Sequence, residues 1–378
     1  MLKGLNLIFP LLGIFLFLAL PSSAPAQEKT KKAEITIKWG TIAPVVTSWG
    51  AATERVNKLI EKESGGRIKN IWFYGAVMGD EMDMIRKVKI GQLQGLAVLT
   101  VGLQKIAPET GALTLPFLFK DYQEVDCTYP KIWNLLGEAF EKHGFVLLGH
   151  TDVCFAIMQT RVSPEMENEL RRDIMADGKI SDPSKNEIFL RYLKQWAWQT
   201  LDIDAFLYKM MGITNVIPLQ LTDVLTALQT GMVNSVYGSC STTVALQWQT
   251  YINYIIKFGG YEGVAYAPAM MVLDKKFFYS LPPDLQKVIR DAWQTELGPG
   301  STRLTLQVRE DEQKMCQGMK NRGTKEITID PELTKLYAEK SKPIYKMMEG
   351  KYYPPEFLQA LEKARDECRA GLEKKPNP

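Results

Sequence analysis

The fold class is decided by residues 35–101, which read ITIKWGTIAPVVTSWGAATERVNKLIEKESGGRIKNIWFYGAVMGDEMDMIRKVKIGQLQGLAVLTV. Apolar residues alternate with polar ones at the start of this stretch, and this period predicts a strand. From Ser48, a good N-cap, apolar residues recur at helical spacing until Gly65-Gly66, a pair that favours a helix end. The same reasoning predicts a strand at 68–74, a helix from Asp80 to Gly91 and a strand at 96–101.

A β-α-β-α-β order predicts a parallel sheet with helices on both faces, so we expect an α/β protein. In such sheets ligands bind at the loops beyond the carboxyl ends of the strands. Those loops are expected here at residues 40–48, 75–79 and 100–103.

The rest of the chain continues this alternation. Strands are expected at 145–148, 155–160, 216–219, 236–237 and 270–273, with an extended segment at 113–119. Helices are expected at 130–142, 202–211, 222–230, in a segment ending at Trp248, and at 331–349 and 354–371. Gly298-Pro299-Gly300 must break the helical segment 283–322, and the charged stretch 163–187 is expected at the surface.

The N-terminus has the layout of a secretory signal peptide. Lys3 supplies a positive charge, residues 5–20 are almost entirely apolar, and small residues lead to an A-x-A site that ends at Ala26. The alternative is a membrane anchor, but the apolar run is shorter than the roughly 20 residues that a spanning helix needs, and Pro10 interrupts it. We expect cleavage after Ala26 and a periplasmic protein.

Length and composition narrow the class of protein. A mature chain of about 350 residues predicts two lobes rather than one core. The net charge of +3 gives no drive toward nucleic acid. The chain has two histidines and no nucleophile-elbow, zinc-protease, Walker A or dinucleotide-binding glycine motif. We therefore expect no enzyme activity, no cofactor and no metal.

The five cysteines show no metal-binding spacing. Cys316 and Cys368 fall on expected helices and could pair with each other. The alternative is that all five are buried as small apolar residues.

Four segments, in this order, resemble the solute-binding subunits of TRAP transporters, the tripartite ATP-independent periplasmic carriers of the dicarboxylate type. They are residues 39–95, LTLPFLFKDYQEVD at 113–126, LTDVLTALQTGMVNSVYG at 221–238 and FFYSLPPDLQKVI at 277–289. The resemblance covers essentially the whole mature chain. It implies a two-lobed periplasmic-binding-protein fold with a central ligand cleft, lobe closure on a small molecule, and delivery to membrane permease subunits.

The resemblance also implies a division of the chain into lobes. Residues 1–26 are the signal peptide, 27–152 with about 263–300 form lobe I, and 153–262 with about 301–378 form lobe II and the C-terminal helices. The long helical segment at the C-terminus is expected to brace both lobes.

The chain departs from the family where the ligand is held. Many relatives hold the ligand's carboxylate with an arginine on the second lobe, and the matching position here is Trp196 or Ala197. A second arginine often lies in the first strand that crosses between the lobes, and that position falls near Phe155. Arginine grips a carboxylate through two hydrogen bonds, which Trp and Phe cannot do. Tyr237-Gly238-Ser239 replaces the Asn or Glu of the family.

We therefore expect a ligand that is apolar or aromatic, neutral or cationic, rather than a small dicarboxylate. The alternative is that Arg161 or Arg191 takes over the carboxylate. The candidate ligand-binding residues lie at strand ends or are aromatic, and core packing is the alternative for each: Trp49, Met78, Thr100, Phe155, Trp196, Trp198, Tyr237 and Ser239.

Two other functions compete with a transport subunit. A sensory or partner subunit would bind a ligand and dock with something other than a permease. A periplasmic enzyme would need a nucleophile, and Cys240 between Ser239 and Ser241 is the only candidate, with no histidine near it in sequence.

Overall fold

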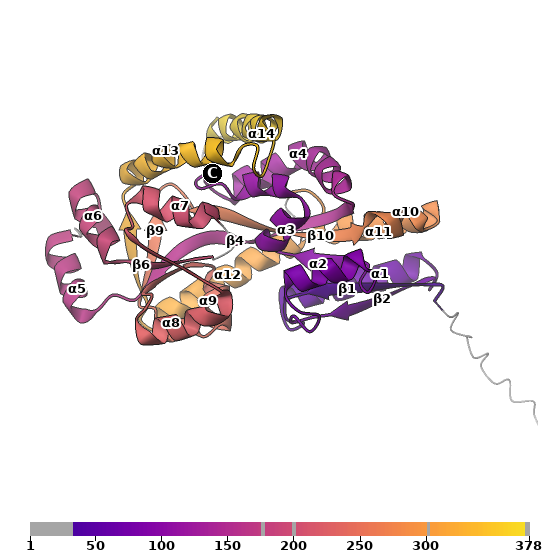
Figure 1. The fold of residues 1–378 in the computed structure, drawn as a ribbon, viewed down its shortest axis with the longest axis horizontal. Helices are drawn as coiled ribbons and strands as arrows, with labels where there is room; N and C mark the ends of the chain where they lie inside the picture. The colour runs from indigo at the N-terminus through magenta and orange to yellow at the C-terminus, as the bar shows by residue number, and fades with distance from the viewer. Residues whose placement is uncertain (1–32, 175–177, 199–201, 301–302, 375–378) are drawn as a thin grey trace, which may run out of the picture.

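The computed structural model describes residues 33–174, 178–198, 202–300 and 303–374. It has two groups of strands and helices joined side by side through one shared strand (Figure 1). We call the group that begins with β1 lobe I and the other lobe II.

Lobe I is built on a five-stranded sheet. Its order is β2 (Ile68–Phe73), β1 (Ile35–Thr41), β3 (Gly95–Val98), β10 (Ala265–Asp274) and β4 (Phe145–Thr160). Its helices are α1 (Ser48–Glu63), α2 (Glu81–Lys89), α3 (Thr100–Ile106), the 3-10 helix Pro108–Thr114, α4 (Tyr122–Lys142), α10 (Lys275–Ser280) and α11 (Pro283–Leu297).

Lobe II shares β4, which continues into a second set of strands. β4 pairs with β8 (Ser235–Gly238), followed by β6 (Lys194–Trp198) and β7 (Asn215–Leu219), and on its other side with β9 (Tyr254–Phe258), β11 (Lys325–Ile329) and β5 (Lys179–Ile180). The helices of this part are α5 (Pro164–Glu169), α6 (Pro183–Tyr192), α7 (Asp202–Met211), α8 (Val224–Thr230) and α9 (Cys240–Ala245). Short helical turns lie at Leu170–Ile174, Leu221–Asp223 and Trp248–Thr250.

Strand directions decide which edges of the two lobes face each other. β4 runs from lobe I into lobe II, β10 is antiparallel to it, and β3 is antiparallel to β10, so β1, β2 and β3 all run toward lobe II. β8 is antiparallel to β4, and β6 and β7 are parallel to β8, so these three run toward lobe I. The carboxyl ends of six strands therefore point toward one another. We call them the facing strand ends.

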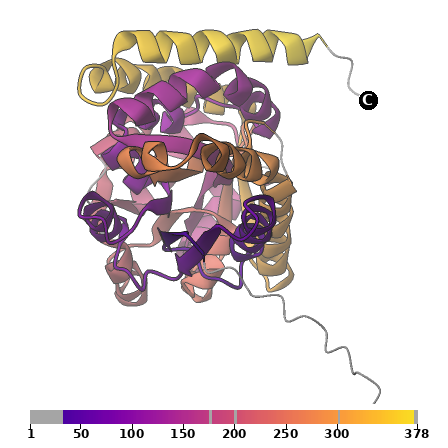
Figure 2. The ribbon, with the colours of Figure 1, turned by 90° about the vertical axis from the view of Figure 1, so that its right-hand side faces the viewer.

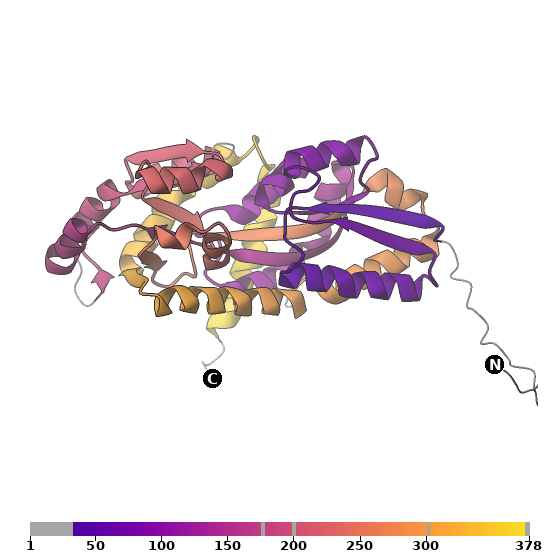
Figure 3. The same cartoon turned by 90° about the horizontal axis from the view of Figure 1, so that it is seen from below.

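One helix, α12 (Arg303–Asn321), contacts both lobes. Leu304 near its start is buried in the lobe I core, and Met319 near its end is buried in the lobe II core. Figure 3 shows it running along one side of the molecule between the lobes.

Arg309 anchors α12 at the middle of β4. Its Nε donates to Asp152 on β4 at 2.6 Å, and its two terminal nitrogens donate to Asp126 on α4 at 2.8 and 2.6 Å. The Tyr266 hydroxyl donates to the other oxygen of Asp152 at 2.5 Å. The guanidinium also lies over the Tyr122 ring, 4.2 Å from its centroid. The buried Asp152 therefore has both a counter-charge and a hydrogen-bond donor.

The C-terminal helices lie together along one face of the molecule, as Figure 2 shows. α13 (Pro331–Met348) packs against α7 of lobe II, and α14 (Pro355–Glu373) packs against α4 of lobe I. Arg369 of α14 donates to both carboxylate oxygens of Glu124 on α4, at 2.5 and 2.7 Å. The pair α13–α14 is thus attached to both lobes.

The predicted pairing of Cys316 with Cys368 is wrong. Cys127 on α4 is bonded to Cys368 on α14, and Cys240 on α9 is bonded to Cys316 on α12. Cys154 is a buried free thiol. Both disulfides attach C-terminal helices to earlier elements, a relationship between distant segments that spacing along the chain cannot reveal.

Several predicted elements also differ from the structure. The strands expected at 145–148 and 155–160 are one continuous strand, β4, and the segment expected to be extended at 113–119 begins as a 3-10 helix. The strands β5, β9 and β11 were not predicted. The break between α11 and α12 was predicted from Gly298-Pro299-Gly300 and is confirmed.

Replacing Arg309 by Leu should strongly destabilise the protein, because Asp152 would remain buried without its counter-charge. We expect the free energy of unfolding to fall by about 3–5 kcal/mol, measured by urea unfolding followed by tryptophan fluorescence. Arg191→Leu is the control, because Arg191 pairs with Glu187 on an exposed surface, where a pair is worth about 1 kcal/mol or less. Equal losses of unfolding free energy in Arg309→Leu and Arg191→Leu would contradict the role of Arg309 as the counter-charge of the buried Asp152.

The disulfide pattern can be checked by alkylation. The denatured, unreduced protein should take up one iodoacetamide group, at Cys154, and the reduced protein should take up five. Peptide mapping should recover the pairs 127–368 and 240–316. A peptide that joins Cys316 to Cys368 would refute the pattern.

Candidate functional site

The connections at the facing strand ends carry almost no charge. They comprise residues 42–47, 74–80, 99, 199–201, 220 and 239, and their sequences contain one acidic residue, Asp80, and no Lys, Arg or His. The first three residues of each following helix add acidic residues and again no basic ones. These segments therefore supply no cationic side chain of their own, although Lys87 of α2 donates a hydrogen bond to the Met78 carbonyl within one of them.

The lobe I side of this region is apolar and exposed. Val45 and Val46, after β1, are 56% and 91% exposed, and Val77, after β2, is 69% exposed. Met78 is half-buried, and its carbonyl accepts a hydrogen bond from Lys87 Nζ at 2.7 Å. Apolar side chains exposed together at a strand end are typical of a surface that contacts a ligand or a partner.

Thr100 is the first residue of α3 and is half-buried at the end of β3. The amides on either side of it are already occupied, because the buried Glu81 carboxylate accepts from Leu99 N at 2.5 Å and from Gly102 N at 2.7 Å. Burial raises the pKa of Glu81 to about 7, although these two hydrogen bonds oppose the shift. Trp49 opens α1 half-buried and packs against the lobe I core.

The lobe II side is aromatic. Trp196 is 1% exposed, and its ring stacks on Tyr237 at 5.2 Å between centroids while its Nε1 donates to the Leu219 carbonyl at 3.2 Å. Trp198 is half-buried at the end of β6, with its ring 5.2 Å from that of Trp196. The structure thus places Trp196 in the core and leaves Trp198 and Tyr237 partly accessible.

Asp204 on α7 lies against these aromatic residues. The Tyr237 hydroxyl donates a hydrogen bond to its Oδ2, and the Trp198 amide donates to the same atom at 3.4 Å. Desolvation raises the pKa of Asp204 to about 8, with the Trp198 hydrogen bond acting in the opposite direction. A carboxyl group with this pKa is mostly neutral at physiological pH.

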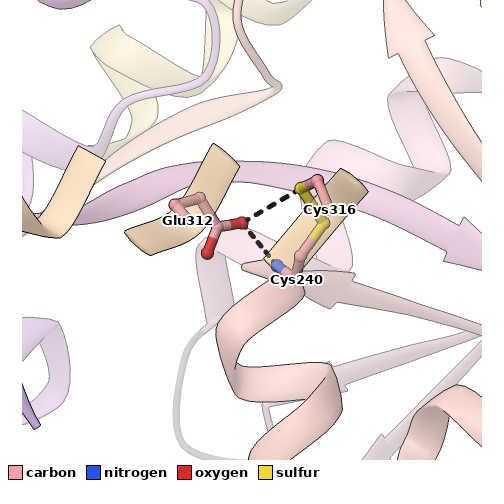
Figure 4. Close-up of side chains that lie close together, drawn as sticks. All are labelled: Cys240, Glu312 and Cys316. Carbon is pink, nitrogen blue, oxygen red and sulfur yellow. Dashed lines mark hydrogen bonds between the residues drawn. A yellow bond between two sulfur atoms is a disulfide. The ribbon is translucent and has the colours of Figure 1, made fainter. Parts of the chain in front are cut away.

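Ser239 and the start of α9 contact α12. Ser239 is buried, and its hydroxyl accepts from Thr242 N at 2.8 Å as an N-cap. Glu312 on α12 accepts from Cys240 N at 2.5 Å, as Figure 4 shows. It also accepts from Ser241 N at 3.0 Å. An internal carboxylate therefore occupies the amides at this helix start.

The same place holds the one group of potential metal ligands found among the described residues. Ligand atoms of Cys240, Glu312 and Cys316 lie within 4.8 Å of one another. The two sulfur atoms are joined in a disulfide, as Figure 4 shows, and a disulfide offers no thiolate to a metal ion. The cluster is therefore a covalent link between α9 and α12.

Phe155 lies behind the facing strand ends, in the crossing part of β4. It is 4% exposed, and its ring packs against those of Tyr122 and Tyr266 at 4.8 and 5.4 Å between centroids. Tyr122 lies between Phe155 and the guanidinium of Arg309. The structure therefore places Phe155 in the core that supports the lobe connection.

The two arginines considered as replacements for the missing clamp lie elsewhere. Arg161 is exposed and follows the end of β4, where Thr160 pairs with the first residue of β8, opposite to the facing strand ends. Arg191 is exposed on α6 and pairs with Glu187. Neither reaches the region between the lobes.

A cavity of about 460 Å³ lies away from this region, beside the C-terminal helices. Its charged residues are internally paired: Arg365 bonds Asp366 at 2.8 Å, and Lys342 bonds Glu339 at 2.9 Å. We assign it no ligand.

Sequence reasoning missed the carboxylates of this site: Glu81, Asp204 and Glu312. Glu81 and Asp204 each fall in the first turn of a helix that follows a strand, a position that could have drawn attention to them. Glu312 gives no such signal, because only the tertiary structure brings α12 to α9.

Asp204→Asn should change how stability depends on pH. The folded state holds the Asp204 proton up to a pKa of about 8, well above the ordinary aspartate value of 3.8. The folded protein therefore binds more protons than the unfolded chain across this range, and wild-type stability should fall relative to the variant as pH rises through it. Urea unfolding from pH 4 to 9 measures the difference. Asp291→Asn, at an exposed ion pair on α11, is the control. If the difference in unfolding free energy between the wild type and Asp204→Asn does not change with pH, the raised pKa of Asp204 is contradicted.

No helix in the described part of the chain is both long and apolar enough to cross a membrane. The predicted signal peptide, residues 1–26, lies outside the described residues.

Comparison with known proteins identifies the family. The chain matches the family described as "Bacterial extracellular solute-binding protein, family 7" over residues 39–167 and 204–351. It is similar to the 2,3-diketo-L-gulonate-binding periplasmic protein YiaO of Escherichia coli, with 24% identity over 78% of this chain and 81% of the relative.

Two solved structures have the same fold. A TRAP periplasmic solute-binding protein from Ochrobactrum anthropi superimposes with a TM-score of 0.74 at 19% identity, covering 90% of this chain and 97% of that one. A second, from Desulfovibrio desulfuricans with bound sn-glycerol-3-phosphate, gives 0.73 at 19% identity, covering 90% and 99%. The predicted α/β two-lobed fold is confirmed. The chain belongs to the bacterial extracellular solute-binding proteins of family 7, the solute-binding subunits of TRAP transporters.

Proposed function

We propose that this subunit binds a neutral or cationic small molecule with an apolar or aromatic part, held between the facing strand ends, and delivers it to TRAP permease subunits. The ligand contacts Trp198 and Tyr237 on lobe II and Thr100, Met78 and Trp49 on lobe I, while the buried Ser239 caps α9 beside them. Phe155 and Trp196 support these residues from the core.

One observation carries the ligand class: the six connections at the facing strand ends contain no Lys, Arg or His. An anion needs a charge-assisted partner when it leaves water. Related proteins bind anions, 2,3-diketo-L-gulonate in YiaO and sn-glycerol-3-phosphate in the D. desulfuricans protein. The family resemblance implies that the positions where many relatives carry arginines hold Trp196 or Ala197 and Phe155 here.

A second observation supports the same class. Backbone amides at helix starts are the other common anion site in proteins. At α3 and α9 these amides already donate to Glu81 and Glu312, respectively. A ligand carboxylate would have to displace an internal one at either place.

The binding mechanism is a shift between open and closed arrangements of the lobes. A ligand that touches both sets of strand ends gains its full contacts only when the lobes approach, so it stabilises the closed form. The proposed division follows the sequence: 27–152 with about 263–300 moves as lobe I, and 153–262 with about 301–378 as lobe II. Residues 1–26 direct export to the periplasm and are removed after Ala26.

No observation favours the enzyme hypothesis. It depended on a free thiol at Cys240, and that sulfur is bonded to Cys316.

Native mass spectrometry of residues 27–378, expressed with export, tests the ligand class. Denaturing the protein releases any retained molecule for identification. A neutral or cationic molecule with an apolar part supports the proposal. A simple mono- or dicarboxylate overturns the ligand class while leaving the transport role intact.

Trp198→Ala should weaken binding of the released molecule by about tenfold or more, because loss of a buried aromatic contact costs on the order of 2 kcal/mol. Calorimetry measures the affinity. Trp133→Ala on α4, half-buried away from the facing strand ends, is the control and should leave affinity unchanged. Trp196 is avoided, since emptying a core site costs about 3–5 kcal/mol of stability. Equal affinities for wild type and Trp198→Ala would remove Trp198 from the site.

A further inference from the structure

Asp204 lies on α7, the helix that follows β6 at the facing strand ends of lobe II. It is the third residue of α7, which follows the end of β6 after residues 199–201. Its side chain is half-buried, and the two donors it meets come from different strands, the Tyr237 hydroxyl on β8 and the Trp198 amide on β6. Its position is therefore fixed by three elements.

The surroundings of Asp204 are aromatic and lack a counter-charge. The buried Tyr208 ring lies 5.4 Å from that of Tyr237, and Trp198 and the buried Trp196 continue this aromatic cluster. Within the described ranges no Lys, Arg or His pairs with Asp204, and the three residues that separate α7 from β6 are Gln, Thr and Leu. Asp204 is therefore mostly protonated at neutral pH in the free protein, and a cation bound beside it would favour its ionised form.

Asp204 differs in this respect from the other carboxylates of the region. Glu81 and Glu312 each accept two backbone N–H donors, and Asp152 is paired with Arg309. Asp204 has one backbone donor, at 3.4 Å, and one phenol. Its raised pKa agrees with this lack of compensation.

We infer that the ligand is an organic cation, with a protonated amine or quaternary ammonium group, and that Asp204 is its counter-ion in a half-site completed by Trp198 and Tyr237. This inference rests on the proposed function and narrows it from neutral or cationic ligands to cationic ones. Aromatic faces attract organic cations through their quadrupoles, and a carboxylate beside them adds a direct charge interaction. One carboxylate is too few oxygen ligands for Ca²⁺ or Mg²⁺, which take six or more.

The other end of such a ligand meets a different surface. The lobe I connections place exposed Val45, Val46 and Val77 opposite the lobe II strand ends. Closure would bring an apolar surface to the ligand from lobe I while its charge lies on lobe II. The chemistry that fits both halves is an amine with an apolar substituent.

Three probes that share one apolar body and differ in charge test the inference: 2-phenylethylamine, 2-phenylethanol and 3-phenylpropanoate. Saturation-transfer NMR and calorimetry compare their binding to residues 27–378 of the wild type, Asp204→Asn and the control Asp291→Asn. We expect the amine to bind most tightly to the wild type and to the control. In Asp204→Asn its affinity should fall by about tenfold or more, the usual loss when one side of a desolvated charge pair is removed. Affinity for the alcohol should change little.

Several outcomes would overturn the inference. They are equal binding of amine and alcohol, preference for the carboxylate, an amine affinity unchanged by Asp204→Asn, or no binding of the amine at millimolar concentration. Asn is isosteric with protonated Asp, and unfolding curves for each variant confirm that the comparison is between folded proteins. Native mass spectrometry decides the proposed function separately. Release of a neutral apolar molecule would support the proposed ligand class but overturn the inference of a cationic ligand. Release of a simple carboxylate would overturn both the ligand class and the inference.

Discussion

The contact between Arg309 and Asp152 is the constraint on which the arrangement of the lobes depends. Asp152 lies in β4 where that strand passes from the lobe I sheet toward lobe II, next to an irregularity in its pairing with β10 at Ala267/Pro268. Burial raises the pKa of Asp152, and the adjacent Arg309 opposes the shift. A carboxylate at this depth is tolerable only with a counter-charge. The helix that supplies it, α12, is therefore held against the crossing point of the two lobes.

From that anchor, α12 reaches both sets of facing strand ends. Asp311 accepts a hydrogen bond from the Ser48 hydroxyl at the start of α1 in lobe I. The next residue, Glu312, accepts from the amides at the start of α9 in lobe II. Three charged residues within one turn of helix thus link the connection between the lobes to both sides of the binding region.

The sequence predicted most of the scaffold because its signals are local. Helix α7 was expected at 202–211 and is found there, and the break at Gly298-Pro299-Gly300 separates two helices as expected. The errors share a cause. β4 was predicted as two strands because Gly149 favours a strand end. The strand instead continues through the buried Asp152, whose partner Arg309 lies 157 residues away. The disulfide pairs and the contacts of Glu312 could not be predicted for the same reason, since each joins segments that are distant in sequence. Among the candidate residues, Trp196 and Trp198 are two residues apart on β6 and therefore share a face of the strand. Spacing alone therefore cannot tell the buried Trp196 from the half-buried Trp198.

The covalent and polar contacts of α12 also indicate where lobe movement is accommodated. The Cys240–Cys316 disulfide and the Glu312 hydrogen bonds fix α12 to α9, so the last two turns of α12 must move with lobe II. At its other end, α12 meets lobe I through side-chain contacts at Ser48 and through packing around Leu304, which can rearrange at lower cost than a covalent bond. Arg309 lies between these ends and contacts β4 and α4 through a planar group on a flexible stem, so its ion pairs can persist while the helix turns about them. Closure of the lobes is therefore expected to bend β4 and β10 near Asp152 and to change the α12–α1 contact, while α9 and the aromatic residues beside Asp204 travel together as one rigid side of the site.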